Sequence, residues 1–140
     1  MKFLTVIVSL SALLGSALAY TSNAGSIEAY ATIVPAGQNA ESHWPKFLKK
    51  HPTIIVRLVS DTCPKCKESQ PAFDAIASKH PEIKVIDINF RKYGFAKNIT
   101  RKRRILSLPA FLFYKDGDLV YVHKARVDEP ILERAIKKHL

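Results

Sequence analysis

Cys63 and Cys66 are the only thiols in this 140-residue chain, and two residues separate them. This spacing places two sulfurs within bonding reach in one turn of helix, as in a dithiol that opens and closes. An apolar, β-branched run from Ile54 to Ser60 precedes the pair, and a helix-like pattern follows it. The first sulfur would then lie among the free backbone N–H groups of a helix N-terminus, which favour its thiolate form. We therefore expect Cys63 to be the exposed nucleophile and Cys66 to be the more buried, resolving thiol.

A cysteine pair can also form a structural disulfide or contribute to a zinc site. A structural disulfide restricts the unfolded chain most when it closes a long loop, and this one would close a gap of two residues. A zinc site usually needs four ligands, and the five histidines show no paired spacing near the cysteines. The spacing therefore favours a redox pair with no metal. Such a pair needs no dissociable cofactor, because its electrons pass to or from another dithiol.

The surrounding residues resemble the active site of thioredoxins. A strand, the Cys-Pro-Lys-Cys motif at 63–66 and Pro71 are similar to the active-site strand and kinked helix of that family. Val85 to Asn89 is similar to the next parallel strand, and Leu108-Pro109 before a strand–turn–strand is similar to the cis-proline loop. The resemblance covers roughly residues 53–140. It implies an α/β, thioredoxin-like fold with a central mixed β-sheet flanked by helices.

The resemblance also assigns roles to the residues around the sulfurs. In thioredoxins the peptide bond before the loop proline is cis, and the preceding residue offers its backbone to an extended substrate. Leu108 would accordingly bind the substrate backbone, and Pro109 would cover the sulfurs. Pro64 and Lys65, between the cysteines, would contact the substrate as well. The implied activity is thiol–disulfide exchange with protein substrates, and the motif leaves open whether the protein reduces, oxidises or isomerises them.

Arg57 departs from the family pattern. It interrupts an apolar strand six residues before Cys63, where thioredoxins carry a buried aspartate, and Asp87 stands in the next strand where many carry a lysine. A buried guanidinium without a partner costs several kcal/mol, so we expect Arg57 and Asp87 to form a buried pair that tunes the site. A cation beneath the cysteines would favour the thiolate and raise the reduction potential above that of ordinary cytosolic thioredoxins. The alternative is a site that reacts slowly in both directions because it lacks the proton-accepting aspartate.

The N-terminus has the pattern of a cleavable secretory signal. A lysine, an apolar run from Phe3 to Leu14 and an Ala-Leu-Ala ending at Ala19 match its three parts, and the run is too short to span a bilayer. We expect a signal peptide over 1–19, one domain over 20–140 without a transmembrane anchor, and secretion or residence in the endoplasmic-reticulum lumen. In a eukaryotic host, Asn98-Ile99-Thr100 would be an N-glycosylation acceptor.

The net charge of +10 at pH 7 suggests a second class of function. A basic face attracts anionic partners at a distance, but no nucleic-acid-reading motif is present, so we expect no nucleic acid. The alternative function is a secreted, non-catalytic binding module that uses this face to engage an anionic surface or an acidic partner. The basic residues concentrate at Arg91-Lys92, Lys97, Arg101 to Arg104 and Lys137-Lys138.

Periodicity and turn residues predict the other elements of the fold. Asp-Gly between two apolar runs is a strong hairpin signal, and Asp128 is a suitable helix N-cap. We expect an edge strand over Ile27–Val34, a helix from Asn39 or Ser42 to Lys50 with Pro45 in its first turn, a helix over Cys66–Lys79 kinked at Pro71, a helix around Tyr93–Arg103, hairpin strands Ala110–Tyr114 and Leu119–His123, and a helix over Asp128–His139.

Overall fold

The computed structural model of the protein describes residues 25–124 and 127–140. The predicted signal peptide, 1–19, lies outside the described residues. Among the helices that are described, none is long and apolar enough to cross a membrane.

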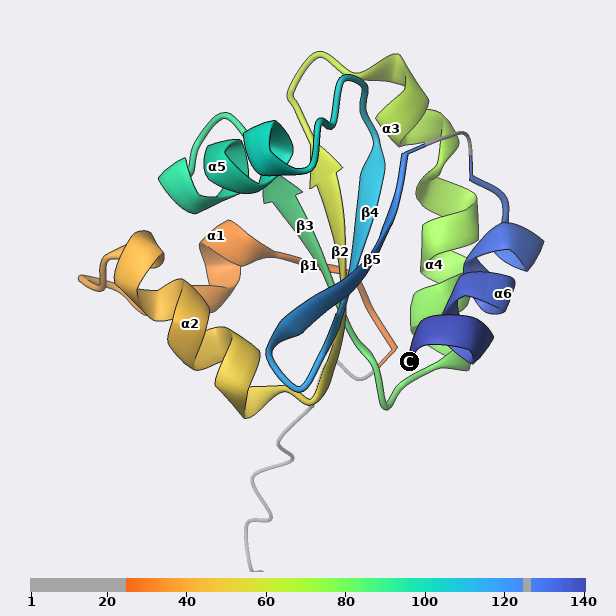
Figure 1. Cartoon of the computed structure of the whole chain (residues 1–140), viewed down its shortest axis with the longest axis horizontal. Coiled ribbons are helices and arrows are strands. Elements are labelled where there is room, and N and C mark those ends of the chain that lie inside the picture. Colours follow the sequence, from red (N-terminus) through yellow and green to blue (C-terminus); the bar gives the residue numbers. More distant parts are fainter. Residues whose placement is uncertain (1–24, 125–126) are drawn as a thin grey trace, which may run out of the picture.

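A five-stranded mixed sheet forms the centre of the molecule (Figure 1). The strands lie in the order β1-β3-β2-β4-β5, with β1, β3 and β2 parallel and β4 and β5 antiparallel to their neighbours. The predicted mixed sheet flanked by helices is therefore confirmed. The strand bounds are Glu28–Ala29 for β1, Thr53–Val59 for β2, Lys84–Asn89 for β3, Ala110–Lys115 for β4 and Asp118–His123 for β5.

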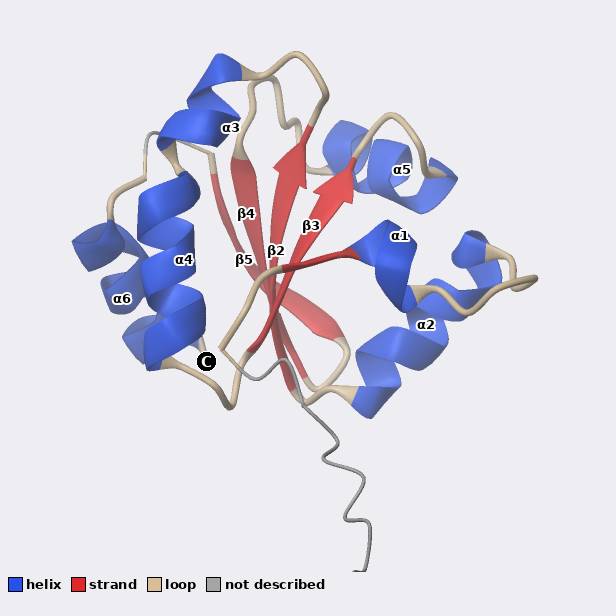
Figure 2. Cartoon of the chain, turned by 180° about the vertical axis from the view of Figure 1, so that it is seen from behind, coloured by secondary structure: helices blue, strands red, loops and turns tan. Residues whose placement is uncertain are grey.

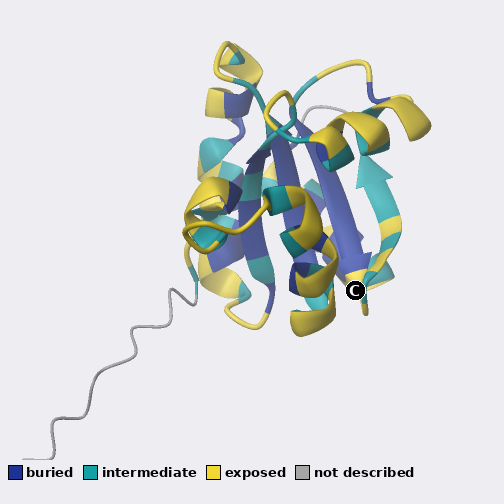
Figure 3. Ribbon diagram, turned by 90° about the vertical axis from the view of Figure 1, so that its left-hand side faces the viewer, coloured by how far each residue is buried: buried dark blue, intermediate teal, exposed yellow. Residues whose placement is uncertain are grey.

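Helices cover both faces of the sheet (Figure 2). One face carries α1 (Tyr30–Ile33), α2 (Ala40–Lys50) and α5 (Gly94–Lys102), and the other carries α3 (Pro64–Glu68), α4 (Gln70–Lys79) and α6 (Glu129–His139). The central strands are buried between these layers, whereas the outer faces of the helices are exposed (Figure 3).

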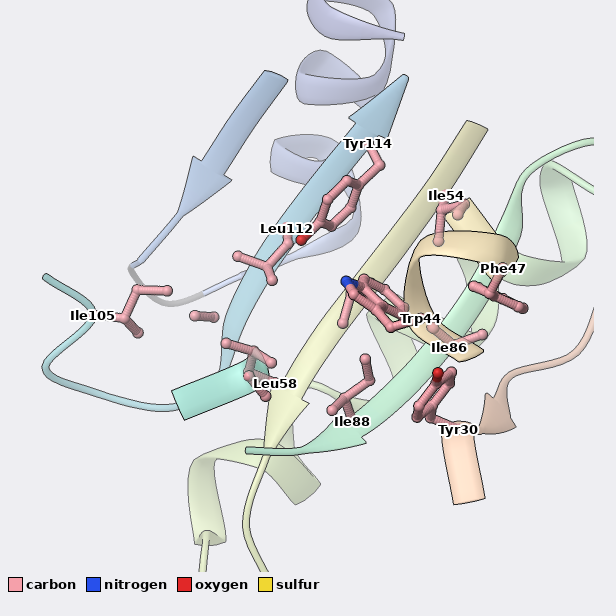
Figure 4. Packing of buried hydrophobic residues seen from close by; sticks show 13 residues of the cluster. Tyr30, Trp44, Phe47, Ile54, Leu58, Ile86, Ile88, Ile105, Leu112 and Tyr114 are labelled. Carbon is pink, nitrogen blue, oxygen red and sulfur yellow. The ribbon is translucent and has the colours of Figure 1, made fainter. Parts of the chain in front are cut away.

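Successive side chains of β2 point to opposite faces, which determines where its one charged residue lies. Ile54, Val56 and Leu58 join the cluster under α2 and α5 (Figure 4), whereas Ile55 packs with the side chains of α4 and α6. Arg57 shares the face of Ile55. The alternation therefore aims its guanidinium at the helix that follows the cysteines.

The predicted edge strand over Ile27–Val34 is wrong beyond its second and third residues. Only Glu28 and Ala29 pair with β3, and the chain then turns into α1. Tyr30 explains the change, because its fully buried ring packs edge-on against four aromatic rings and its hydroxyl donates to the carbonyl of Ala40 at 3.0 Å. Tertiary packing of one aromatic side chain thus overrides the local strand preference. The four rings are those of Trp44, Phe47, Tyr93 and Phe95.

Pro45 and Pro71 lie at other positions in their helices than predicted. Asn39 caps α2 by accepting the Glu41 N–H at 2.8 Å, so Pro45 lies inside the helix and not in its first turn. The expected kinked helix is two helices, because the chain breaks at Ser69 and Pro71 stands in the first turn of α4, where a missing N–H costs nothing. All other predicted elements agree with the structure to within one residue at each end.

Candidate redox site

Cys63 and Cys66 form a disulfide at the point where β2 passes into α3, with an S–S distance of 2.18 Å. Cys63 is the N-cap of α3, and its Sγ accepts the backbone N–H of Cys66 at 3.1 Å. Cys63 is partly exposed, whereas Cys66 is only 6% exposed. The predicted order of exposure is confirmed, and the N–H that lies against the outer sulfur would stabilise a thiolate there.

Arg57 and Asp87 make the predicted pair, in which Arg57 is buried and Asp87 is partly exposed. They lie opposite each other in the register of β2 and β3, and the Arg57 side chain is 3% exposed. Nε donates to Oδ1 at 2.8 Å and Nη2 donates to Oδ2 at 2.6 Å, a two-pronged contact that compensates the buried charge. Only the tuning role assigned to the pair stays a prediction.

The same guanidinium is bonded to the active-site helices. Nη1 donates to the Cys66 carbonyl and to the Ser69 hydroxyl, both at 3.1 Å, and Nη2 donates to the Gln70 side-chain oxygen at 2.6 Å. All five guanidinium N–H groups therefore have acceptors. The Ser69 hydroxyl in turn donates to the Cys66 carbonyl at 2.8 Å. Arg57 thus fixes the turn between α3 and α4, directly below the second cysteine.

The pairing changes the expected electrostatics of the site. The dithiol lies near an ion pair, not near a bare cation, so the field at the sulfurs is weaker than the Arg57 charge alone would give. Arg57 is nevertheless the partner bonded to the active-site helices, and the side chain of Asp87 is 24% exposed. The positive end of the pair therefore lies nearer to Cys66.

The Leu108–Pro109 peptide bond is cis, and Pro109 is buried where the loop enters β4. Two surface grooves meet at this loop. Cys63, Pro64, Lys65 and Leu108 line the first, and Lys65, Leu108 and Pro109 line the second with the N-terminal end of α6. Pro64, Lys65 and Leu108 thus line one groove with the outer cysteine, whereas Pro109 lines the adjoining groove.

Asn98, by contrast, is exposed on α5 and lines neither groove. No group of three or more His, Cys, Asp or Glu side chains in residues 25–124 and 127–140 is arranged to hold a metal ion.

Two features of the site were not predicted from the sequence. Ser69 is 4% exposed and, with Gln70, supplies two of the three acceptors that Arg57 has besides Asp87; the third is the Cys66 carbonyl. A buried arginine facing a helix demands such acceptors, and the Ser-Gln pair shortly after Cys66 was the available signal. The second feature is Leu106, 94% exposed beside the cis-proline loop. Nothing in the sequence distinguishes it from a buried leucine.

Fold and site together define a protein with a CxxC disulfide at the N-terminal end of a helix on a mixed α/β sheet. The family model described as Thioredoxin matches residues 35–138. The chain therefore belongs to the thioredoxin family.

Individual relatives are distant. The chain is 26% identical over 78 residues to a thioredoxin-like protein of Fusarium culmorum, which covers 56% of this chain and 64% of the relative. It is 31% identical over 84 residues to a thioredoxin-like protein of Acanthamoeba polyphaga mimivirus, with 59% of each covered. The chain thus spans less than two thirds of the length of these curated relatives.

Solved structures of low identity share the fold. A thioredoxin variant from Halobacterium salinarum superimposes with a TM-score of 0.64 at 15% identity, over 85% of this chain and 95% of that one. A thioredoxin from Plasmodium falciparum gives a TM-score of 0.60 at 20% identity, over 71% and 94%.

Proposed function

We propose that the protein is a thiol–disulfide oxidoreductase that exchanges disulfides with protein substrates through Cys63 and Cys66. The observation that carries this proposal is the placement of the outer sulfur. Cys63 Sγ accepts a helix N–H, stands at the surface beside the Leu108–Pro109 loop, and has Cys66 bonded behind it. A nucleophile and its resolving thiol need this arrangement.

In the reducing direction, the Cys63 thiolate attacks one sulfur of a substrate disulfide. A mixed disulfide forms, and the other substrate sulfur leaves as a thiolate and takes a proton from solvent. Cys66, as thiolate, then attacks Cys63 Sγ, so that the 63–66 disulfide closes and the second substrate thiol is released. Two electrons pass from the dithiol to the substrate, and the reverse sequence oxidises a substrate dithiol.

Arg57 affects the second step, the attack of Cys66 on Cys63, through its charge. A guanidinium does not accept a proton, so it cannot replace the aspartate of the family pattern as a base. Its positive charge, held below Cys66 by the bond to the Cys66 carbonyl, instead stabilises the thiolate. Stabilising the reduced form makes the protein more oxidising, and we propose a reduction potential above that of aspartate-bearing thioredoxins.

We further propose that the protein acts in an oxidising compartment, as a secreted or endoplasmic-reticulum protein. The N-terminal pattern ending at Ala19 supports this location. A high potential would suit such a compartment, because a pair that is easily reduced stays in the disulfide form only where the surroundings are oxidising.

Trapping tests the activity. In the Cys66→Ala variant, Cys63 can form mixed disulfides but cannot release them, so covalent adducts with protein substrates should accumulate. The Cys63→Ala variant is the matched control and should form few. If both variants form adducts equally, or neither does, the proposed exchange reaction is wrong.

The predicted basic residues do not form one face, because Lys137 and Lys138 lie on α6, across the sheet from α5 (Figure 1). The cations at α5 support a second candidate function. Lys97, Arg101 and Arg104 are exposed, and no carboxylate in the described part of the chain lies within ion-pair distance of them. A non-catalytic module that binds an anionic surface or acidic partner through these cations would bind equally well after Cys66→Ala or Cys63→Ala.

A further inference from the structure

A groove leads from the outer cysteine to the basic end of α5. Its first part is lined by Cys63, Pro64 and Lys65 on one side and by the loop before the cis-proline on the other. Its second part lies over the end of α5. The two parts share four wall residues, so they form one continuous surface depression. The shared residues are Phe90, Thr100, Ile105 and Leu106.

The floor of this groove is apolar. Phe90 packs against the core with its ring partly exposed, and Ile105 is buried beneath the loop. Leu106 stands almost free of contacts at 94% exposure, although it is two residues from the cis peptide bond. Phe90, Ile105 and Leu106 together make an apolar patch beside the cysteines, and patches of this kind mark contact sites for partners.

The rim of the groove is cationic. Lys97 and Arg101 lie four residues apart on α5, and Arg104 follows the helix with a left-handed backbone conformation at φ 50°. Arg91 lies over the Phe90 ring, 5.7 Å from its centre. No acidic residue lines the second part of the groove, and Glu68 is the sole one in the first part. The positive potential at the far end is therefore uncompensated.

We infer that this groove selects the substrate. It takes an extended segment with an apolar side chain beside the reactive cysteine and acidic side chains a few residues further along. The apolar residue would cover Leu106, and the carboxylates would reach Lys97, Arg101 and Arg104. Cationic rims of this kind speed the encounter with acidic partners and disfavour basic ones. The inference rests on the proposed exchange activity and names the chemistry of its preferred substrates.

Disulfide exchange with designed peptides tests it. Each peptide carries one cysteine as a mixed disulfide with 2-mercaptoethanol and a neighbouring leucine, followed by Glu, Gln or Lys residues, with the flank placed on either side of the cysteine. Second-order rate constants are measured for the reduced, full domain at low ionic strength. The Glu peptides should react about tenfold faster than the Lys peptides, and the ratio should fall toward one in about 1 M salt.

Charge variants locate the effect. Lys97→Gln/Arg101→Gln should lower the Glu-to-Lys ratio several-fold. Lys137→Gln/Lys138→Gln removes the same charge from the exposed end of α6, across the sheet, and should leave the ratio unchanged. In a second peptide set, serine replaces the leucine beside the cysteine. Leu106→Ser should slow the leucine-bearing peptides relative to this serine set, whereas Val120→Ser, at the other exposed large apolar side chain in the described residues, should not.

The outcomes separate this inference from the function on which it rests. If no peptide reacts, the exchange activity itself is wrong. If all peptides react at equal rates, the activity stands and the selective groove is wrong. If Lys97→Gln/Arg101→Gln weakens binding to heparin, a polyanion without cysteine, while the rate ratio stays unchanged, the cations belong to a general anion-binding face and the inference is overturned.

Discussion

Removing the carboxylate of Asp87 tests whether the ion pair compensates a buried charge. Asp87→Asn keeps the shape of the side chain but leaves the guanidinium of Arg57, 3% exposed, without a counter-charge. Breaking a buried pair from one side costs about 3–5 kcal/mol. Three of the five guanidinium bonds, to Cys66, Ser69 and Gln70, survive the change. We therefore expect a loss near the lower limit, about 3 kcal/mol.

Urea unfolding of the oxidised protein measures this loss. Asp118→Asn removes an exposed carboxylate from the β4–β5 hairpin and is the matched control, for which we expect a change below about 0.5 kcal/mol. If Asp87→Asn costs less than about 1 kcal/mol, Arg57 is solvated or paired otherwise, and the compensation derived from the two-pronged contact is wrong.

The same variant makes a prediction about redox chemistry. Without the Asp87 charge, the field of Arg57 at Cys66 is stronger, so the thiolate is favoured and the potential should rise, by about 30 mV for each tenfold shift of the dithiol–disulfide equilibrium toward the dithiol. Arg57→Met removes the cation and should lower the potential. Equilibration with glutathione measures both. Shifts of the same sign in the two variants would refute the tuning role of the pair.

Three further predictions concern the stability and modification of the chain. Burial lowers the pKa of His80, but hydrogen bonds with Glu133 and Glu82 outweigh it and raise the pKa above its ordinary value. The resulting stabilisation is full below about pH 6.5 and is lost as the pH rises through the folded-state pKa of His80. It should be under about 1 kcal/mol, because the ring is partly exposed. Urea titrations across about pH 5.5–8.5 measure it, and His80→Gln should remove it. Gly117 has φ 89° with open space around it, so Gly117→Ala should cost about 1 kcal/mol from backbone strain alone, measured by thermal unfolding; an unchanged midpoint would contradict this. Expressed through a eukaryotic secretory pathway, the protein should carry a glycan at Asn98 that N-glycosidase removes and that Asn98→Gln abolishes; a single, enzyme-insensitive band would contradict both modification and route.

Much of the fold followed from local sequence signals. The hairpin turn was predictable because Asp and Gly tolerate the positive φ angles that a two-residue turn requires. Asp116 and Gly117 both have positive φ in the structure. The edge strand was mispredicted because Tyr30 enters a cluster of aromatic rings from α2 and α5, and no local pattern shows which distant rings will meet.

Two kinds of site residue were predictable from the sequence. The first are residues close together in the chain, and the second are charged residues in apolar strands, which need a partner when they are buried. The Cys63–Cys66 pair belongs to the first kind. Arg57 belongs to the second, since a charge in an apolar strand had to find Asp87 or an equivalent acid. Leu106 belongs to neither, because its exposure depends on how the loop after α5 reaches β4.

The most direct test of the account is the redox equilibrium of the folded domain. Oxidised protein is held at graded ratios of reduced to oxidised glutathione, quenched with an alkylating reagent and analysed by mass spectrometry at Cys63 and Cys66. We predict a reversible transition in which both thiols appear together, with Cys63 the more rapidly alkylated at limiting reagent. A bridge that stays closed at every ratio until the protein unfolds would contradict the account.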